Sequence, residues 1–301
     1  MNGLIHKEGS MNISQFFQAT PNVILFQHAP IRFCKWYLNL LGSLYYIVNR
    51  REHHVIEKNI KTVFKESGEV KIIVKNTFRG IFTHYAEKLI VAHRNFARVK
   101  QELEKITHFS GLENLDEALK KGGVILVTAH LGGVEFLPLV LSLRKYPITM
   151  VVRFQTARLK ETLMKRAVEV NAELIDSESE NVLQKAMDSL KKGRILLTEC
   201  DEIDAWKPTK NNTINAFGGQ IILDRSLEVM CRRSRSTVLG SFMIRRDGGY
   251  ELTIVPFGDE SKIASEGLSA VILKTFEQIV MMFPDQWYQW KKFHKMRPEM
   301  A

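Results

Sequence analysis

The stretch Val124–Leu141, VILVTAHLGGVEFLPLVL, joins a run of aliphatic residues to a histidine. Its first residues are typical of a strand that is covered on both faces. His130 stands where this strand should end, two glycines follow it, and an apolar segment resumes after Glu135. Because ligands of α/β proteins gather at the carboxyl ends of strands, the stretch predicts that His130 lies at the ligand-binding edge of a sheet.

Strand-like and helix-like segments alternate after this stretch. Expected strands lie at 148–154, 172–177 and 194–200, and expected helices at 135–145, 157–171 and 181–193. The two strand-like runs within 236–258 meet at an Asp-Gly turn, which is typical of a hairpin. The polar residues 201–215 are expected to form a loop. This order predicts an α/β fold with a mixed, largely parallel central sheet flanked by helices.

The N-terminal third has helical spacing throughout, and no convincing linker interrupts the chain. We therefore expect one domain over residues 1–301 with a helical N-terminal portion. No run of about 18 uncharged apolar residues is present, so no spanning helix is expected. Within residues 22–51, the uncharged and aromatic Trp36–Val48 segment precedes two arginines. This pattern fits a helix buried against the domain, and also a helix that anchors at a membrane interface.

The chain is basic, with 43 Lys+Arg against 33 Asp+Glu and a net charge of +10 among 301 residues. An excess of this size favours an anionic partner, such as a membrane surface or a phosphorylated substrate, or serves only solubility. No zinc spacing or RNA-binding signature supports nucleic-acid binding. The three cysteines have no metal-like spacing, so we expect no metal, no disulfide framework and a reducing compartment.

His130 and Glu135 have the residue types of a catalytic dyad. A carboxylate in the first turn of the following helix can accept one ring proton and fix the tautomer. The other ring nitrogen is then free to act as a general base. Because no G-x-S-x-G elbow is present, the nucleophile would come from the substrate. The same pair is also typical of a structural histidine that a helix carboxylate caps.

The segment A-H-L-G-G-V-E resembles the H-x-x-x-x-D/E signature of the lysophospholipid acyltransferase superfamily. More narrowly, the chain is similar to the late acyltransferases of bacterial lipid A biosynthesis, from about Arg32 to Arg297. The resemblance extends to five further segments: RREHHVIEKNIKTVF at 50–64, MVVRF at 150–154, NAFGG at 215–219, the hairpin RRSRSTVLGSFMIRRDGGYELTIVP at 232–256 and PDQWYQWKKFH at 284–294. It implies a glycerol-3-phosphate acyltransferase-like fold.

The resemblance also implies a reaction. An acyl chain would pass from acyl carrier protein or coenzyme A to a hydroxyl of a lipid A precursor or related glycolipid, without a cofactor or an acyl-enzyme. His130 would be the general base and Glu135 would orient it. Arg153 would bind substrate phosphate or developing negative charge. Gly132 and Gly133 would let the substrate approach the backbone, and their N–H groups would hold the oxyanion.

One departure concerns the acceptor side. The family has an Asp-Gln pair before the Phe-Phe-Gly block, and Asp201 is the best match to its aspartate as a substrate-binding residue. Glu199 and Asp204 compete for that match, and Glu202 replaces the glutamine. The acceptors that remain open are the lipid A precursor, an amine-bearing lipid and a phosphoinositide mannoside. A non-catalytic lipid-binding homologue is the other alternative. The expected location is the cytoplasmic face of the bacterial inner membrane, against its anionic surface.

Overall fold

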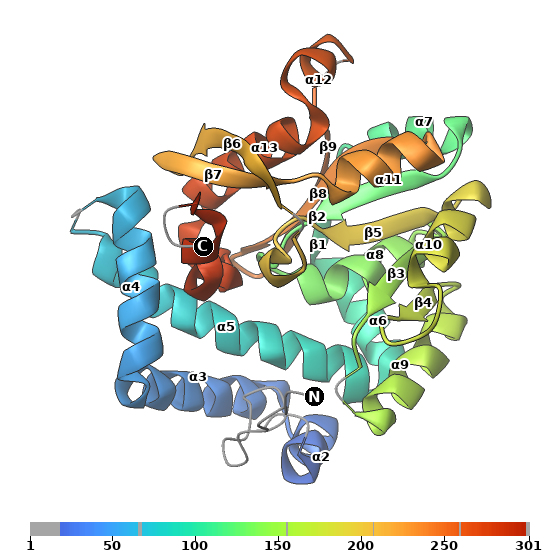
Figure 1. Cartoon of the computed structure of the whole chain (residues 1–301). Coiled ribbons are helices and arrows are strands. Elements are labelled where there is room, and N and C mark those ends of the chain that lie inside the picture. Colours follow the sequence, from blue (N-terminus) through green and yellow to red (C-terminus); the bar gives the residue numbers. More distant parts are fainter. Residues whose placement is uncertain (1–18, 66–67, 155, 207, 259, 299–301) are drawn as a thin grey trace, which may run out of the picture.

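The computed structural model describes residues 19–65, 68–154, 156–206, 208–258 and 260–298 (Figure 1). Its centre is a seven-stranded sheet with the order β1-β9-β8-β2-β5-β3-β4. Neighbouring strands are parallel except for the antiparallel pair β8–β9. The strands of this sheet are β1 (Thr107–Ser110), β2 (Val124–Thr128), β3 (Ile148–Val152), β4 (Glu173–Asp176), β5 (Ile195–Glu199), β8 (Thr237–Arg246) and β9 (Gly249–Pro256). The predicted mixed, largely parallel α/β sheet is confirmed.

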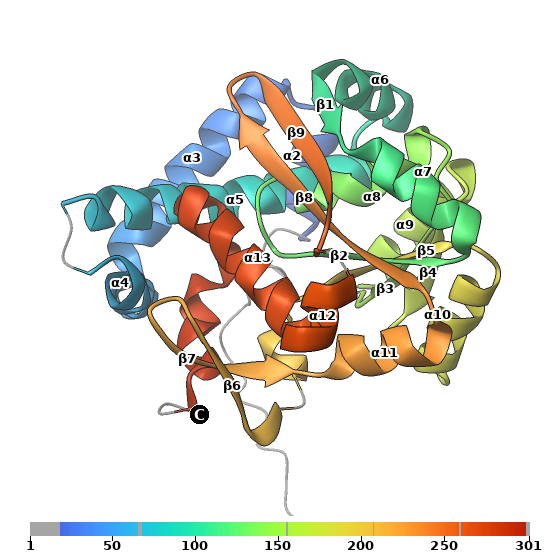
Figure 2. The same ribbon diagram turned by 90° about the horizontal axis from the view of Figure 1, so that it is seen from above.

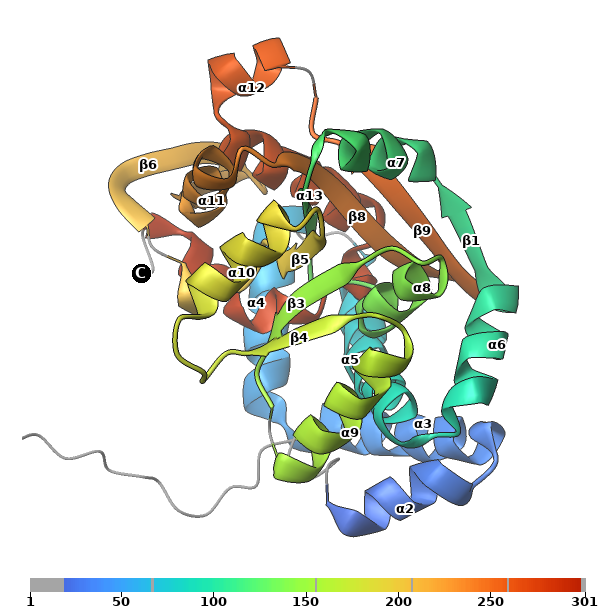
Figure 3. The ribbon, with the colours of Figure 1, turned by 90° about the vertical axis from the view of Figure 1, so that its right-hand side faces the viewer.

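Helices cover both faces of the sheet, as Figure 3 shows for α8 and α10 on opposite sides of β3. Those C-terminal to the first strand are α7 (Leu112–Lys121), α8 (Leu137–Leu143), α9 (Ala157–Glu169), α10 (Val182–Lys191), α11 (Ser226–Ser234), α12 (Glu260–Glu266) and α13 (Leu268–Met282). All five residues of β2 are buried. Val124 and Leu126 pack with α7 and α8, whereas Ile125 and Val127 pack with α10 and α13. This two-sided burial explains why β2 is apolar without alternation.

The N-terminal portion is helical, as expected. It consists of α2 (Thr20–His28), α3 (Ile31–Val48), α4 (Arg50–Phe64), α5 (Val70–His93) and α6 (Phe96–Ile106). Figure 1 shows the long helix α5 crossing beneath the sheet, with α3 packed below it. Segment 22–51 is therefore not one helix, because Pro30 and Asn49 interrupt it as caps. None of the helices in the described part of the chain has the length and apolar character needed to cross a bilayer.

The described part of the chain contains two hairpins, with α11 between them. The Asp-Gly turn joins β8 to β9 with Arg246 opposite Gly249, as predicted. The prediction of a loop over 201–215 was wrong in its second half. Residues 208–216 form β6 (Pro208–Ala216), which pairs with β7 (Gly219–Asp224) across a two-residue turn (Figure 2). Phe217 and Gly218 both have positive φ there, which matches the twist of a tight hairpin.

Candidate active site

His130 is held by Asp201 at the carboxyl edge of the sheet. Thr128 of β2 lies opposite Glu199 of β5, so the residues that follow each strand meet beyond the edge. The His130 Nδ1 lies 3.0 Å from Asp201 Oδ1, and the backbone N–H of His130 donates to the same carboxylate. The Asp201 side chain is fully buried. A buried carboxylate on Nδ1 fixes the ring orientation and leaves Nε2 as the reactive nitrogen.

The C-terminal segment completes this arrangement. It contains two 3₁₀ helices, η3 (Pro284–Gln286) and η4 (Tyr288–Met296), with Trp287 between them. Trp287 is completely buried, and its indole Nε1 donates to Asp201 Oδ2 at 2.8 Å. The backbone N–H of Tyr288 donates to the His130 carbonyl at 2.9 Å. Burial alone would raise the pKa of Asp201, but the positive charge of His130 and the hydrogen bonds from His130 and Trp287 lower it.

Three carboxylates surround the imidazole. Burial alone would lower the pKa of His130, yet Asp201, Glu199 and Glu202 outweigh it and raise the pKa to about 9. Glu202 Oε1 lies 3.4 Å from Nε2, and the Glu202 side chain is 47% exposed. Burial raises the pKa of Glu199. The resting imidazole is therefore protonated at neutral pH, with Glu202 next to the nitrogen that a substrate hydroxyl would use.

Glu135 lies in a different set of contacts from the one that the sequence predicted. It belongs to the short 3₁₀ helix η1 (Val134–Phe136) and faces α5. Its Oε1 is 3.4 Å from both His84 Nε2 and Lys88 Nζ. Within the described residues, no hydrogen bond joins Glu135 to His130, so the carboxylate that orients the imidazole is that of Asp201. The catalytic role of Glu135 itself stays a prediction.

Electrostatics support an ion pair between Glu135 and Lys88. Burial would raise the pKa of Glu135, but Lys88 and His84 lower it. The charge of Glu135 raises the pKa of Lys88, so both groups are charged at neutral pH. His84 is different, because burial lowers its pKa to about 3 and keeps the ring neutral. The His84 ring lies 6.5 Å from the His130 ring, centroid to centroid, which places this cluster beside the imidazole.

Gly132 and Gly133 are required by the fold. Gly132 has a φ of +57°, and a Cβ there would lie 2.0 Å from the Met243 carbonyl of β8. A Cβ on Gly133 would meet the Tyr250 ring at 2.5 Å. Their N–H groups already donate to the carbonyls of Gln286 and Met243. Both groups are thus engaged within the chain, and these contacts give no support to the predicted substrate-binding role.

Arg153 follows β3 at the same carboxyl edge and is exposed. Within the described residues, no hydrogen bond or ion pair engages its guanidinium, so its predicted contact with substrate stays a prediction. Across all the residues that the structure describes, no group of three or more His, Cys, Asp or Glu side chains is arranged to hold a metal ion.

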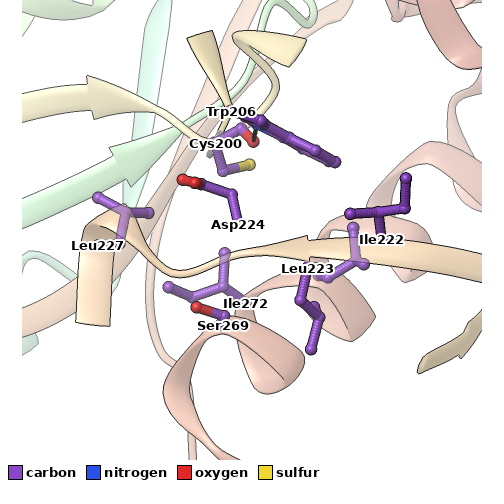
Figure 4. A pocket seen from close by; sticks show the side chains of 9 residues that line it. Cys200, Trp206, Ile222, Leu223, Asp224, Leu227, Ser269 and Ile272 are labelled. Atoms are coloured by element: carbon purple, nitrogen blue, oxygen red, sulfur yellow. Dashed lines mark hydrogen bonds between the residues drawn. The ribbon is translucent and has the colours of Figure 1, made fainter. Parts of the chain in front are cut away.

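A mostly apolar pocket adjoins the candidate site on the side of the β6–β7 hairpin (Figure 4). It begins at Cys200, the residue before Asp201. The carbonyl of Cys200 accepts a hydrogen bond from Trp206 Nε1. Ile222 and Leu223 of β7 and Ile272 of α13 form much of its lining. The pocket therefore offers apolar contacts close to the carboxylate that holds His130.

Sequence reasoning missed the contributions of α5 and of Trp287. His84 and Lys88 stand one helical turn apart, with the buried Glu87 beside them, on a helix that is otherwise rich in core residues. Such polar residues on a largely buried helix are a signal that could have been followed, because burying them requires partners. Trp287 carries no comparable signal, since a tryptophan in a terminal segment is usually a core residue.

The arrangement pairs the partly exposed His130 with the buried Asp201 and leaves the second ring nitrogen, Nε2, next to Glu202. No curated protein matches the chain. A protein-family model described as bacterial lipid A biosynthesis acyltransferase matches residues 19–295 and so includes every residue of the site. Over nearly its whole length, from α2 to η4, the chain thus belongs to the family of bacterial lipid A biosynthesis acyltransferases.

Proposed function

We propose that the protein moves a fatty acyl chain from acyl carrier protein or coenzyme A to a hydroxyl of a lipid A precursor or related glycolipid. The observation that carries the proposal is the contact of His130 Nδ1 with the fully buried Asp201 carboxylate. Family membership supports acyl transfer to a lipid in general. The identity of the donor and acceptor and the role of each residue are parts of the proposal.

In the proposed reaction, Nε2 of neutral His130 takes the proton of the acceptor hydroxyl while its oxygen attacks the thioester carbonyl. The tetrahedral intermediate then collapses, the carbon–sulfur bond breaks, and the imidazolium gives its proton to the leaving thiolate. Asp201 stabilises the imidazolium between the two steps. Because Glu202 lies next to Nε2, the acceptor hydroxyl would have to take its place there.

The carboxylates near Nε2 favour a second candidate acceptor, an amine-bearing lipid. Glu202 is half exposed at the imidazole, and Glu199 interacts electrostatically with the same ring. Carboxylates attract a protonated amine and repel a phosphate placed at the same point. A neutral amine would attack the thioester as a hydroxyl does, and His130 would remove its proton. A phosphate on a glycolipid acceptor would have to lie away from these groups, for example near Arg153.

The proposed location is the cytoplasmic face of the bacterial inner membrane, and it rests on one face of α3. Apolar side chains recur there every three or four residues and are between 43% and 65% exposed; they are Phe33, Trp36, Leu40, Leu44 and Ile47, called here the α3 stripe. Arg50 and Arg51 at the start of α4 are exposed next to it in the chain. An apolar stripe followed by cations suits an anionic membrane surface.

Acyl transfer is tested with purified protein, membrane lipid and labelled acyl thioesters of both carriers. The wild type is expected to label a lipid, and His130→Ala is expected to lose that activity by about 10³-fold or more. Mass spectrometry of the product distinguishes an ester from an amide and so decides between the two acceptors. Equal labelling by both proteins would refute the role of His130. No labelling with either carrier would refute the proposed function.

Membrane binding is tested by sedimentation with vesicles of anionic and of neutral phospholipid. Trp36→Ser together with Ile47→Ser removes two members of the α3 stripe and is expected to release the protein into the supernatant. The control is Leu183→Ser, because Leu183 is 52% exposed on α10, away from α3 (Figure 3). If the control releases as much protein as the stripe variant, the assignment of this face is wrong.

A further inference from the structure

The acyl-transfer reaction needs a group that stabilises the oxyanion of the tetrahedral intermediate, and the four backbone N–H groups from His130 to Gly133 are all engaged within the chain. The N–H groups of His130, Leu131, Gly132 and Gly133 donate to Asp201, Ala129, Gln286 and Met243 respectively. Three of these hydrogen bonds hold the turn against β8, η3 and the segment that follows β5. A side-chain donor is therefore the candidate for a task that backbone N–H groups often perform in acyl transfer.

The cations near this turn differ in how free their donors are. Arg245 on β8 gives two N–H groups to the buried Glu87 at 2.7 Å each, so its charge is already paired. Among the residues that the structure describes, Lys88 on α5 pairs with Glu135 alone, at 3.4 Å from its Oε1, and the Lys88 side chain is 30% exposed. An ammonium carries three N–H donors, so two of them remain for a ligand. Lys88 thus combines a charge, spare donors and access.

Lys88 is also close to the reacting edge. Its partner Glu135 contacts His84 as well, and the His84 ring is 6.5 Å from the His130 ring. Lys88 interacts electrostatically with Glu199, the residue of β5 that lies opposite Thr128. The charged groups around Lys88 are thus Glu199 of β5 and Glu135 of η1, with His130, after β2, beyond them. We propose that the Lys88 ammonium donates to the oxyanion of the tetrahedral intermediate, while Glu135 holds it in place.

This inference rests on the proposed function and assigns the site a second catalytic residue. In the first step, the acceptor oxygen bonds to the thioester carbon, and the carbonyl π electrons move to the oxygen that Lys88 contacts. In the second step, those electrons re-form the carbonyl as the thiolate leaves. Lys88 keeps its proton throughout, so His130 alone moves protons. Glu135 acts through Lys88 and is a positioning residue.

The test compares Lys88→Met with the wild type in acyl transfer and in the binding of two unreactive donor analogues. Both analogues are built on whichever carrier the wild type accepts. One is a thioether, which lacks the carbonyl, and the other is a trifluoromethyl ketone, which hydrates to a tetrahedral adduct. We expect kcat to fall about 10²–10³-fold with little change in KM. The affinity for the ketone should fall in step, whereas that for the thioether should not change.

Two further variants complete the design. Lys88→Arg keeps the charge and is expected to recover at least tenfold of the lost kcat. Lys100→Met is the matched control, because Lys100 also pairs with a glutamate, Glu169 at 3.8 Å, but on the outer helices α6 and α9. Circular dichroism and thermal unfolding show whether each variant is folded.

Several results would overturn the assignment of Lys88. An unchanged kcat would do so, and so would an equal loss of affinity for both analogues, since that would place Lys88 on the donor ground state. If Lys88→Met is unfolded, the decision passes to Lys88→Arg, in which a reduced preference for the ketone over the thioether supports the inference and the full wild-type preference refutes it. A wild type that binds neither analogue and transfers no acyl group refutes the proposed function itself, and the inference with it.

Discussion

Replacing Asp201 by Asn tests the central contact of the candidate site. The pKa of His130 is about 9, against 6.5 for an ordinary histidine. Each pKa unit corresponds to 1.36 kcal/mol, so the surrounding carboxylates favour the imidazolium by roughly 3 kcal/mol after the cost of burial. Among these carboxylates, Asp201 raises the pKa of His130 the most, and its side chain is fully buried. In Asp201→Asn, we therefore expect the pKa of His130 to fall to about 7 or below.

Two assays follow this change. If neutral His130 is the general base, kcat/KM of the wild type rises with pH through about 9. In Asp201→Asn, this rising limb of the pH–rate profile moves toward neutral pH. The maximal rate should fall by up to about 10⁴-fold, because the tautomer and orientation of the ring are no longer fixed. Stability provides the second assay. A folded pKa above the unfolded one stabilises the protein below pH 6.5, and this contribution is lost as the pH rises through 9.

Urea denaturation between pH 6.5 and 9.5 measures that loss, which we expect to be roughly 3 kcal/mol in the wild type and nearly absent in Asp201→Asn. The control is Asp204→Asn, which removes the same charge three residues away. Asp204 pairs with Lys292 and Lys295 on η4 and does not contact the imidazole. If the rate limb and the pH dependence of stability stay at their wild-type positions in Asp201→Asn, the His–Asp pair is not what sets the protonation of His130.

Three further variants probe neighbouring contacts. Glu202→Gln should lower the apparent pKa of the kcat/KM limb by less than Asp201→Asn does, because Glu202 is 47% exposed and solvent screens its charge; a larger shift would contradict this ranking. Trp287→Phe loses the donor to Asp201 and part of a buried ring, so urea denaturation should show a loss of about 2–4 kcal/mol; a loss under about 0.5 kcal/mol would argue against this contact. Glu87→Gln leaves the buried Arg245 unpaired and should cost about 3–5 kcal/mol, whereas Glu57→Gln, at a partly exposed pair on α4, should cost under about 1 kcal/mol in the same assay.

Much of the fold could be predicted from local pattern. The first four residues of β2 are aliphatic, so the sequence indicated a doubly covered strand, and burial of the whole strand bears this out. The Asp-Gly turn predicted the β8–β9 hairpin, because only a few residue pairs adopt its backbone angles without strain. The hairpin of β6 and β7 was missed because its turn begins with Phe217, a bulky residue at positive φ. The fold tolerates this angle since Phe217 is completely buried.

The sequence alone placed His130 at the end of a buried strand, and this follows from hydrophobic patterning and the rule for strand ends. Only the tertiary structure decided which carboxylate reaches it. Glu135 is near in the chain, but the glycine turn and η1 direct it to Lys88 on α5. Asp201 is 71 residues away, yet β2 and β5 are neighbours in the sheet, and Trp287 holds the carboxylate from the far end of the chain. Side-chain direction after a strand depends on packing against distant elements, and no local pattern encodes it.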